Sequence, residues 1–139
     1  MVFFTDCLLH LCRIIRILKF ERGNALLIGV GGSGRKSLTR LASYNRRCDC
    51  FEIQITKSYG VREFYEDLSR LLIKAGVEET SVSFLFGDNQ IISDQFLEAI
   101  NNILNCGWVP NLFEPEQIIQ IIDDCRANAI KEGYEDMND

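Results

Sequence analysis

The sequence predicts an α/β fold built on a parallel sheet. A continuous apolar run over residues 25–30 is too short for a helix and fits a strand that is buried on both faces. A glycine-rich turn follows it at once, and helical and strand-like patterns then alternate along the chain. The length of 139 residues allows one domain at most. Because 47% of the residues are apolar, the chain can form a hydrophobic core, which argues against disorder.

The first elements surround the glycine-rich turn. Residues 6–19 predict an amphipathic helix, because apolar side chains recur at helical spacing while His10 and Arg13 fall on another face. The first strand is expected over residues 25–30. A short helix over 37–45 and a second strand over 50–56, where apolar and polar residues alternate, complete a βαβ pattern.

The second half of the chain predicts three helices and one strand. A helix opens after Tyr59 and Gly60 and stops at Gly76, and the third strand covers residues 82–86. Ser93 is the expected N-cap of a helix that ends near Gly107. A loop over 108–113 leads to a helix over 114–131 with a proline in its first turn, and residues 132–139 form an acidic tail that we expect to fray.

Charge and cysteine content exclude several classes of protein. A net charge of -5 without a long run of like charges argues against a nucleic-acid-binding surface that covers the whole protein, and leaves room for a local basic site. The six cysteines include no CxxC pair and have only His10 to assist them, so we expect reduced cytosolic thiols and no zinc site. Basic residues and His10 interrupt the apolar stretch over 7–20, which predicts a soluble protein without a membrane span.

The glycine-rich turn predicts a phosphate site, because glycines between a strand and a helix let backbone N–H groups point at an anion. One interpretation is the dinucleotide fingerprint GxGxxG, which Gly29, Gly31 and Gly34 satisfy. That fingerprint requires an acid at the end of the second strand, and Glu52 comes too early for this role. A tight turn without any ligand is a further alternative.

The other interpretation is the P-loop, GxxxxGK[ST], aligned on Gly29 and Gly34. Arg35 then stands at the lysine position and can place positive charge on a β- or γ-phosphate. Lys36 stands at the Ser/Thr position, where it cannot coordinate Mg²⁺, and Ser37 comes one residue late. The candidate nucleotide-binding residues are Gly29, Val30, Gly31, Gly32, Ser33, Gly34, Arg35, Lys36 and Ser37.

A P-loop protein also needs an acid at the end of a buried strand to hold the metal. Asp88, which follows the third strand, is the candidate metal ligand, although a simple turn would explain it as well. The next position, which in many ATPases carries a glutamate that acts on the attacking water, is Asn89. Because an amide cannot take a proton, we expect weak or no hydrolysis and assign no catalytic residue.

Four segments in order, residues 23–35, 55–61, 84–91 and 103–113, resemble the fourth AAA+ module of axonemal dynein heavy chains. The resemblance covers nearly the whole chain. It implies a regulatory module that binds ATP or ADP, with Mg²⁺, and that belongs by class to the P-loop ATPases. The Arg35-Lys36 pair departs from the family, whose members usually carry an uncharged polar residue at the second position.

The resemblance also implies an architecture, a partial AAA+ three-layer sandwich. A complete module has a parallel sheet in the strand order 5-1-4-3-2 and a helical lid, of which this sequence supplies strands 1 to 3. Strands 4 and 5 and the lid are missing, so residues 1–139 are expected to form an incomplete large subdomain with its P-loop to Walker B core at 25–113. The first and third strands must then pair directly, leave a gap or find a partner chain.

The resemblance implies other AAA+ modules of a dynein heavy chain and dynein-associated chains as partners. Microtubules would be reached only through segments absent here, and neither nucleic acid nor membrane is an expected partner. The implied location is the cytoplasm and cytoskeleton, in the ciliary axoneme. Two further alternatives are a true ATPase in which Arg35 and Ser37 suffice, and a truncated isoform or structural fragment that binds no nucleotide.

Overall fold

The computed structural model describes residues 4–134, which form two compact units. The first unit takes in the chain up to Gln54 together with Ser81–Ile91, and the second takes in Ile55–Thr80 and the chain from Ile92 onward. Among the residues described, no helix is long and apolar enough to cross a membrane.

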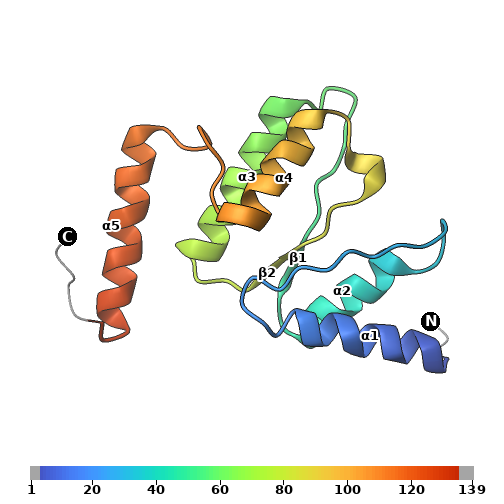
Figure 1. Cartoon of the computed structure of the whole chain (residues 1–139). Helices are drawn as coiled ribbons and strands as arrows, with labels where there is room; N and C mark the ends of the chain where they lie inside the picture. The colour runs from blue at the N-terminus through green and yellow to red at the C-terminus, as the bar shows by residue number, and fades with distance from the viewer. Residues whose placement is uncertain (1–3, 135–139) are drawn as a thin grey trace. The chain divides into compact units, whose positions relative to one another are not determined.

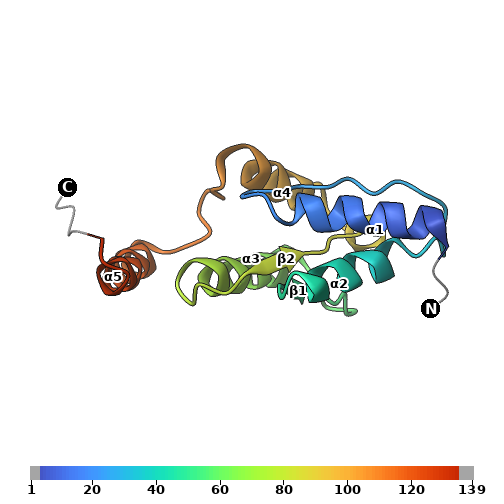
Figure 2. The ribbon, with the colours of Figure 1, turned by 90° about the horizontal axis from the view of Figure 1, so that it is seen from below.

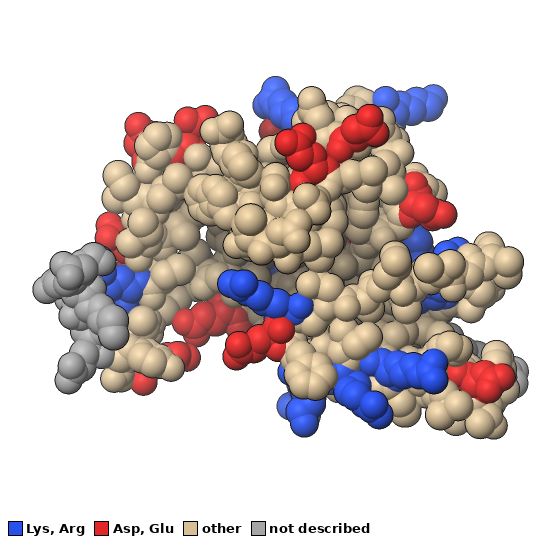
Figure 3. Space-filling view, in the orientation of Figure 1, with Lys and Arg blue, Asp and Glu red and all other residues tan. Residues whose placement is uncertain are grey.

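Two helices form the hydrophobic core of the first unit. The helices α1 (Thr5–Ile17) and α2 (Arg35–Asn45) lie side by side (Figures 1 and 2). Their buried apolar residues form one cluster, made of Cys7, Ile14, Leu38 and Ala42. The amphipathic helix predicted over 6–19 is thus confirmed, although it ends at Ile17, and α2 begins two residues earlier than predicted. Figure 3 shows Lys and Arg side chains gathered along the exposed side of α1.

The second and third predicted strands pair in parallel, which confirms the α/β class with a parallel sheet. The strands β1 (Asp49–Phe51) and β2 (Val82–Phe84) align with Cys50 opposite Ser83. A buried contact of 2.6 Å between the hydroxyls of Ser43 and Ser83 joins α2 to β2. Both strands are shorter than predicted, because only three residue pairs share a ladder.

The prediction of a doubly buried strand over residues 25–30 is wrong. This segment has no regular structure, and Leu26 and Ile28 are each 86% exposed and Val30 79% exposed. A strand forms only where a neighbour completes its hydrogen bonds, and the sheet of the described residues contains β1 and β2 alone. Of the three arrangements expected for the incomplete sheet, direct pairing of this segment with β2 is therefore wrong. Leu27 alone packs against the core of α1 and α2.

The second unit contains α3 (Val61–Gly76), α4 (Asp94–Cys106) and α5 (Pro115–Lys131). Figure 1 shows α3 beside α4, where the rings of Phe64 and Phe96 stack with their centroids 4.0 Å apart. Both rings are fully buried, so this stack is part of the core of the unit. The Asn128 side chain of α5 donates a hydrogen bond of 2.7 Å to the Val77 carbonyl.

The predicted ends of these helices are confirmed. The Ser93 hydroxyl accepts a hydrogen bond from the Gln95 N–H, and Gly107 terminates α4 with a φ of +69°. Pro115 is the first residue of α5, and residues 108–113 form a loop. The predicted tail lies mostly outside the described residues, although 132–134 are already past the helix.

We predict that Phe96→Ala destabilises the second unit by about 3 to 5 kcal/mol, because it removes one ring of a fully buried stack. Leu97→Ala is the matched control on the same helix turn, since Leu97 is 45% exposed. Urea unfolding followed by circular dichroism measures both variants. Equal losses of stability in the two variants would contradict this description of the core.

We also predict that replacing Leu26 and Ile28 together by Thr reduces self-association of the chain. Exposed apolar segments in an extended conformation attract further chains, and neither side chain contributes a buried contact. Light scattering over a range of protein concentrations measures the effect, and the unfolding midpoint should stay unchanged. A large drop in that midpoint would show that this segment is packed.

Candidate functional site

The glycine-rich loop depends on two residues in the left-handed region. Gly32 has a φ of +76° and Gly34 a φ of +81°, values that side-chain-bearing residues rarely adopt. The Ser33 N–H donates to the Val30 carbonyl at 3.2 Å, which closes a tight turn before the helix. Gly34 is the N-cap of α2, so the loop leads directly into the N-terminus of this helix.

The first turn of α2 presents backbone donors that have no partner among residues 4–134. Gly34 supplies no side-chain cap, and in the described part of the chain the N–H groups of Arg35, Lys36 and Ser37 donate no hydrogen bond. The helix dipole adds partial positive charge at the same place. Such a helix start, preceded by glycines, is suited to an anion such as a phosphate.

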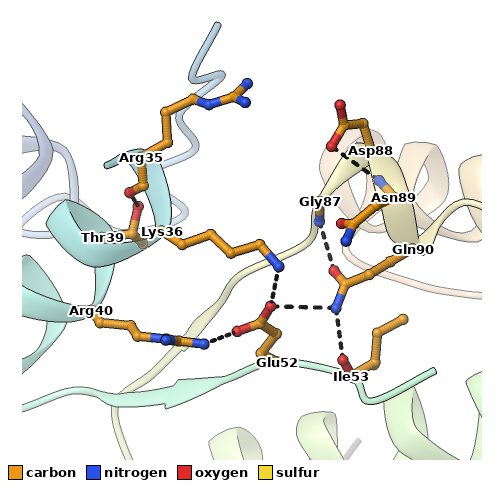
Figure 4. A network of polar contacts seen from close by, with 10 residues as sticks. All are labelled: Arg35, Lys36, Thr39, Arg40, Glu52, Ile53, Gly87, Asp88, Asn89 and Gln90. Carbon is orange, nitrogen blue, oxygen red and sulfur yellow. Dashed lines mark hydrogen bonds and ion pairs between the residues drawn. The ribbon is translucent and has the colours of Figure 1, made fainter. Parts of the chain in front are cut away.

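The two adjacent basic residues that begin α2, Arg35 and Lys36, point to different partners. The Arg35 guanidinium approaches the Val30 carbonyl at 3.4 Å, and Figure 4 shows it directed away from Lys36. Ser37 is exposed on the first turn of α2. Arg35 thus lies on the loop side of the helix start, where the P-loop alignment predicts a contact with a phosphate.

Lys36 and Arg40 reach a common carboxylate, that of Glu52. Their positions, four residues apart on α2, put both on one helix face. Lys36 Nζ lies 2.5 Å from Glu52 Oε1, and an Arg40 guanidinium nitrogen lies 2.5 Å from Oε2 (Figure 4). The Glu52 side chain is only 17% exposed. One carboxylate therefore pairs with two cations, so Lys36, Arg40 and Glu52 together have a net positive charge.

The pKa of Glu52 reflects this balance. Burial alone would raise its pKa, but the hydrogen bonds and charges of Lys36 and Arg40 outweigh the burial and hold the pKa below the usual value. Glu52 is therefore ionised at neutral pH, and its contacts with the two cations persist there.

Gln90 connects the ends of the two strands. Its Nε2 donates to the Ile53 carbonyl at 2.6 Å, and its Oε1 accepts from the Gly87 N–H at 2.7 Å. The same Nε2 lies 3.5 Å from Glu52 Oε1, and Gln90 is 4% exposed. The buried amide thus joins the segment after β1 to the short helix η1 (Asp88–Gln90) after β2.

The predicted metal ligand Asp88 is exposed at the start of η1. Its Oδ1 accepts a hydrogen bond of 3.0 Å from the Asn89 N–H, and Figure 4 shows the carboxylate turned away from Glu52. Among residues 4–134, no group of three or more His, Cys, Asp or Glu side chains could hold a metal ion. Asp88 therefore offers a metal one exposed carboxylate.

The sequence motifs predict neither Arg40 nor Gln90 in this site, and they suggest Glu52 only as a candidate ribose-binding acid. The four-residue spacing of Lys36 and Arg40 was a usable signal, because it predicts two cations on one face of a helix. The position of Glu52 in the chain gave no such signal, since its partners come from a helix and from the end of another strand. In this arrangement the Glu52 carboxylate is already occupied, which argues against a ribose contact.

We predict that Glu52→Gln lowers the free energy of unfolding by about 1 to 3 kcal/mol at pH 7, because the two cations lose a charged acceptor. Since the pKa of Glu52 is lowered on folding, its contribution is complete above the ordinary carboxyl pKa and disappears as the pH falls through the lowered value. The difference between wild type and variant should therefore vanish in acid. Glu66→Gln is the control, because Glu66 is exposed and pairs with exposed Arg62. A pH-independent difference, measured by urea unfolding, would contradict this assignment.

Known proteins resemble the chain over nearly its whole length. The family described as "P-loop containing dynein motor region D4" matches residues 1–139. "Dynein axonemal heavy chain 1" of Rattus norvegicus is 47% identical over 135 residues, 97% of this chain. "Dynein axonemal heavy chain 6" of Homo sapiens is 47% identical over 138 residues, 99% of the chain. The "Dynein-1-beta heavy chain, flagellar inner arm I1 complex" of Chlamydomonas reinhardtii is 51% identical over 133 residues, 96% of the chain.

The chain spans 3% of the length of each of these relatives. The family match covers every residue and includes the glycine-rich loop, α2 and the strand ends that meet at Glu52 and Gln90. The short parallel sheet is consistent with part of an AAA+ domain. Because the family match covers residues 1–139, the chain belongs to the family of the P-loop containing dynein motor region D4.

Proposed function

We propose that the chain is a nucleotide-binding regulatory module that binds ATP or ADP at residues 29–37. The observation that carries the proposal is the start of α2, where three successive N–H groups have no partner in the described part of the chain and follow a glycine-rich loop. The net positive charge shared by Lys36, Arg40 and Glu52 lies beside it and favours an anion further. The family description, which names a P-loop, supports the same ligand class.

Hydrolysis by this module is weak or absent. Asn89 occupies the position at which a P-loop ATPase carries a glutamate, and its amide cannot accept a proton from water. Glu52 is a poor substitute, because a carboxylate with a lowered pKa that is paired with two cations is a weak base. The module is therefore suited to sensing nucleotide rather than to turning it over.

The larger context comes from the relatives, which are named as axonemal and flagellar dynein heavy chains. In our proposal residues 1–139 form an incomplete AAA+ large subdomain, with residues 25–113 as its P-loop to Walker B part and 114–131 as a further helix. It contacts other AAA+ modules of a dynein heavy chain and dynein-associated chains, and microtubules only through other segments. Its location is the cytoskeleton of the ciliary axoneme.

A second candidate function is association without nucleotide. The exposure of Leu26, Ile28 and Val30 favours it, because an extended apolar segment can accept a strand from another polypeptide. In that case the glycine-rich loop serves only as a turn.

Titration with a fluorescent ADP analogue tests the proposal. Gly34→Ala should weaken binding about tenfold, because a side chain strains the left-handed residue that positions the N–H groups. Gly133→Ala is a matched control, since Gly133 has a φ of +90° and equally open surroundings but lies in the other unit. It should leave the affinity unchanged.

Two results would contradict the proposal. A folded chain that binds no analogue favours association as the function. If the chain releases phosphate from ATP and the substitution Arg35→Ala abolishes this release, the chain is a true ATPase instead.

A further inference from the structure

Lys36 stands at the sequence position where P-loop proteins have a Ser or Thr that binds the metal ion. In those proteins Mg²⁺ is held between a hydroxyl in the first turn of the helix and an aspartate at the end of a neighbouring strand. Lys36 is the second residue of α2, at the position of that hydroxyl. An ammonium group only donates hydrogen bonds, so it cannot coordinate a cation and repels one.

The Lys36 side chain extends from the helix start toward the end of β2. Its ammonium lies 2.5 Å from Glu52 Oε1, and its Cε lies 3.5 Å from the position that a Cβ on Gly87 would take. Gly87 directly precedes Asp88, the predicted metal ligand. Figure 4 shows the ammonium between α2 and the Gly87–Gln90 turn. The positive charge of Lys36 therefore lies between the start of α2 and the end of β2, the two positions from which a P-loop protein would bind Mg²⁺.

The other possible ligands do not fit a magnesium ion. The Asp88 carboxylate is exposed, accepts the Asn89 N–H and is turned away from Glu52. Ser37 is displaced by about 100° around the helix from the hydroxyl position. Glu52, the carboxylate nearest to Lys36, is paired with two cations. The side chains of this site therefore do not provide the oxygen ligands needed by the Mg²⁺ ion that the fold family implies.

The same group is suited to contact a phosphate directly. Lys36 uses one of its three N–H donors on Glu52, which leaves two for phosphate oxygens. Arg40 shares the charge of Glu52, so Lys36 and Arg40 together outweigh the carboxylate by one positive charge. Glu52 holds the ammonium near the strand end, which limits the cost of ordering a long side chain.

We propose that the Lys36 ammonium takes the place of Mg²⁺ in this site, so that the chain binds the phosphates of ATP or ADP without a metal. This inference rests on the proposed nucleotide site. It concerns binding alone and adds no chemical step.

The test is a titration of the full chain with a fluorescent ADP analogue, once with saturating Mg²⁺ and once with excess EDTA. The wild-type dissociation constant should agree within about twofold between the two conditions. Lys36→Ser restores the hydroxyl and removes the charge, so its affinity in EDTA should fall about tenfold and recover in Mg²⁺. Lys57→Ser, which removes an exposed lysine of the other unit, should behave like wild type.

Lys36→Gln covers the case in which the serine variant does not fold, because its amide can still donate to Glu52. It should bind more weakly than wild type in EDTA, and unchanged binding by this variant overturns the inference. A wild-type affinity that falls tenfold in EDTA overturns it as well, while leaving the nucleotide site intact. Absence of wild-type binding in both conditions overturns the proposed function together with the inference.

Discussion

The polar contacts of the first unit depend on the ionised carboxylate of Glu52. It holds α2 through Lys36 and Arg40 and lies beside Gln90, which joins the segment after β1 to the turn after β2. Because the side chain is largely buried, the carboxylate stays charged only where cations compensate its loss of hydration. The contacts of Glu52 with Lys36 and Arg40 supply this compensation, and they fix the start of α2 relative to the strand ends.

This constraint explains how the glycine-rich loop keeps its form although residues 25–30 form no strand. The helix side of the loop is held by Glu52, by the buried contact of Ser43 with Ser83 and by the apolar cluster that α2 shares with α1. The loop itself turns on Gly32 and Gly34, whose conformations need no sheet. The helix N-terminus that would receive a phosphate is therefore set by α2, and the exposed segment before it contributes little.

The sequence predicted the features that local interactions decide. Ser93, Gly107 and Pro115 act on their own helix ends, so their roles could be inferred from residue type and spacing. The segment 25–30 was mispredicted, because its apolar run indicates burial but cannot show whether a neighbouring strand is present. The Glu52 contacts were missed for the same reason, since they join residues that are 12 to 38 positions apart. Lys36 was recognised as unable to bind Mg²⁺, but its actual partner required the structure.

A double-mutant cycle between Lys36→Met and Glu52→Gln tests the central claim, that Glu52 fixes the start of α2 through a charged contact. Urea unfolding at neutral pH gives the free energy of unfolding of the wild type, the two single variants and the double variant. The account predicts a coupling of about 1 kcal/mol or more, since the two groups touch and one is largely buried. Additive effects, with a coupling below about 0.3 kcal/mol, would contradict it.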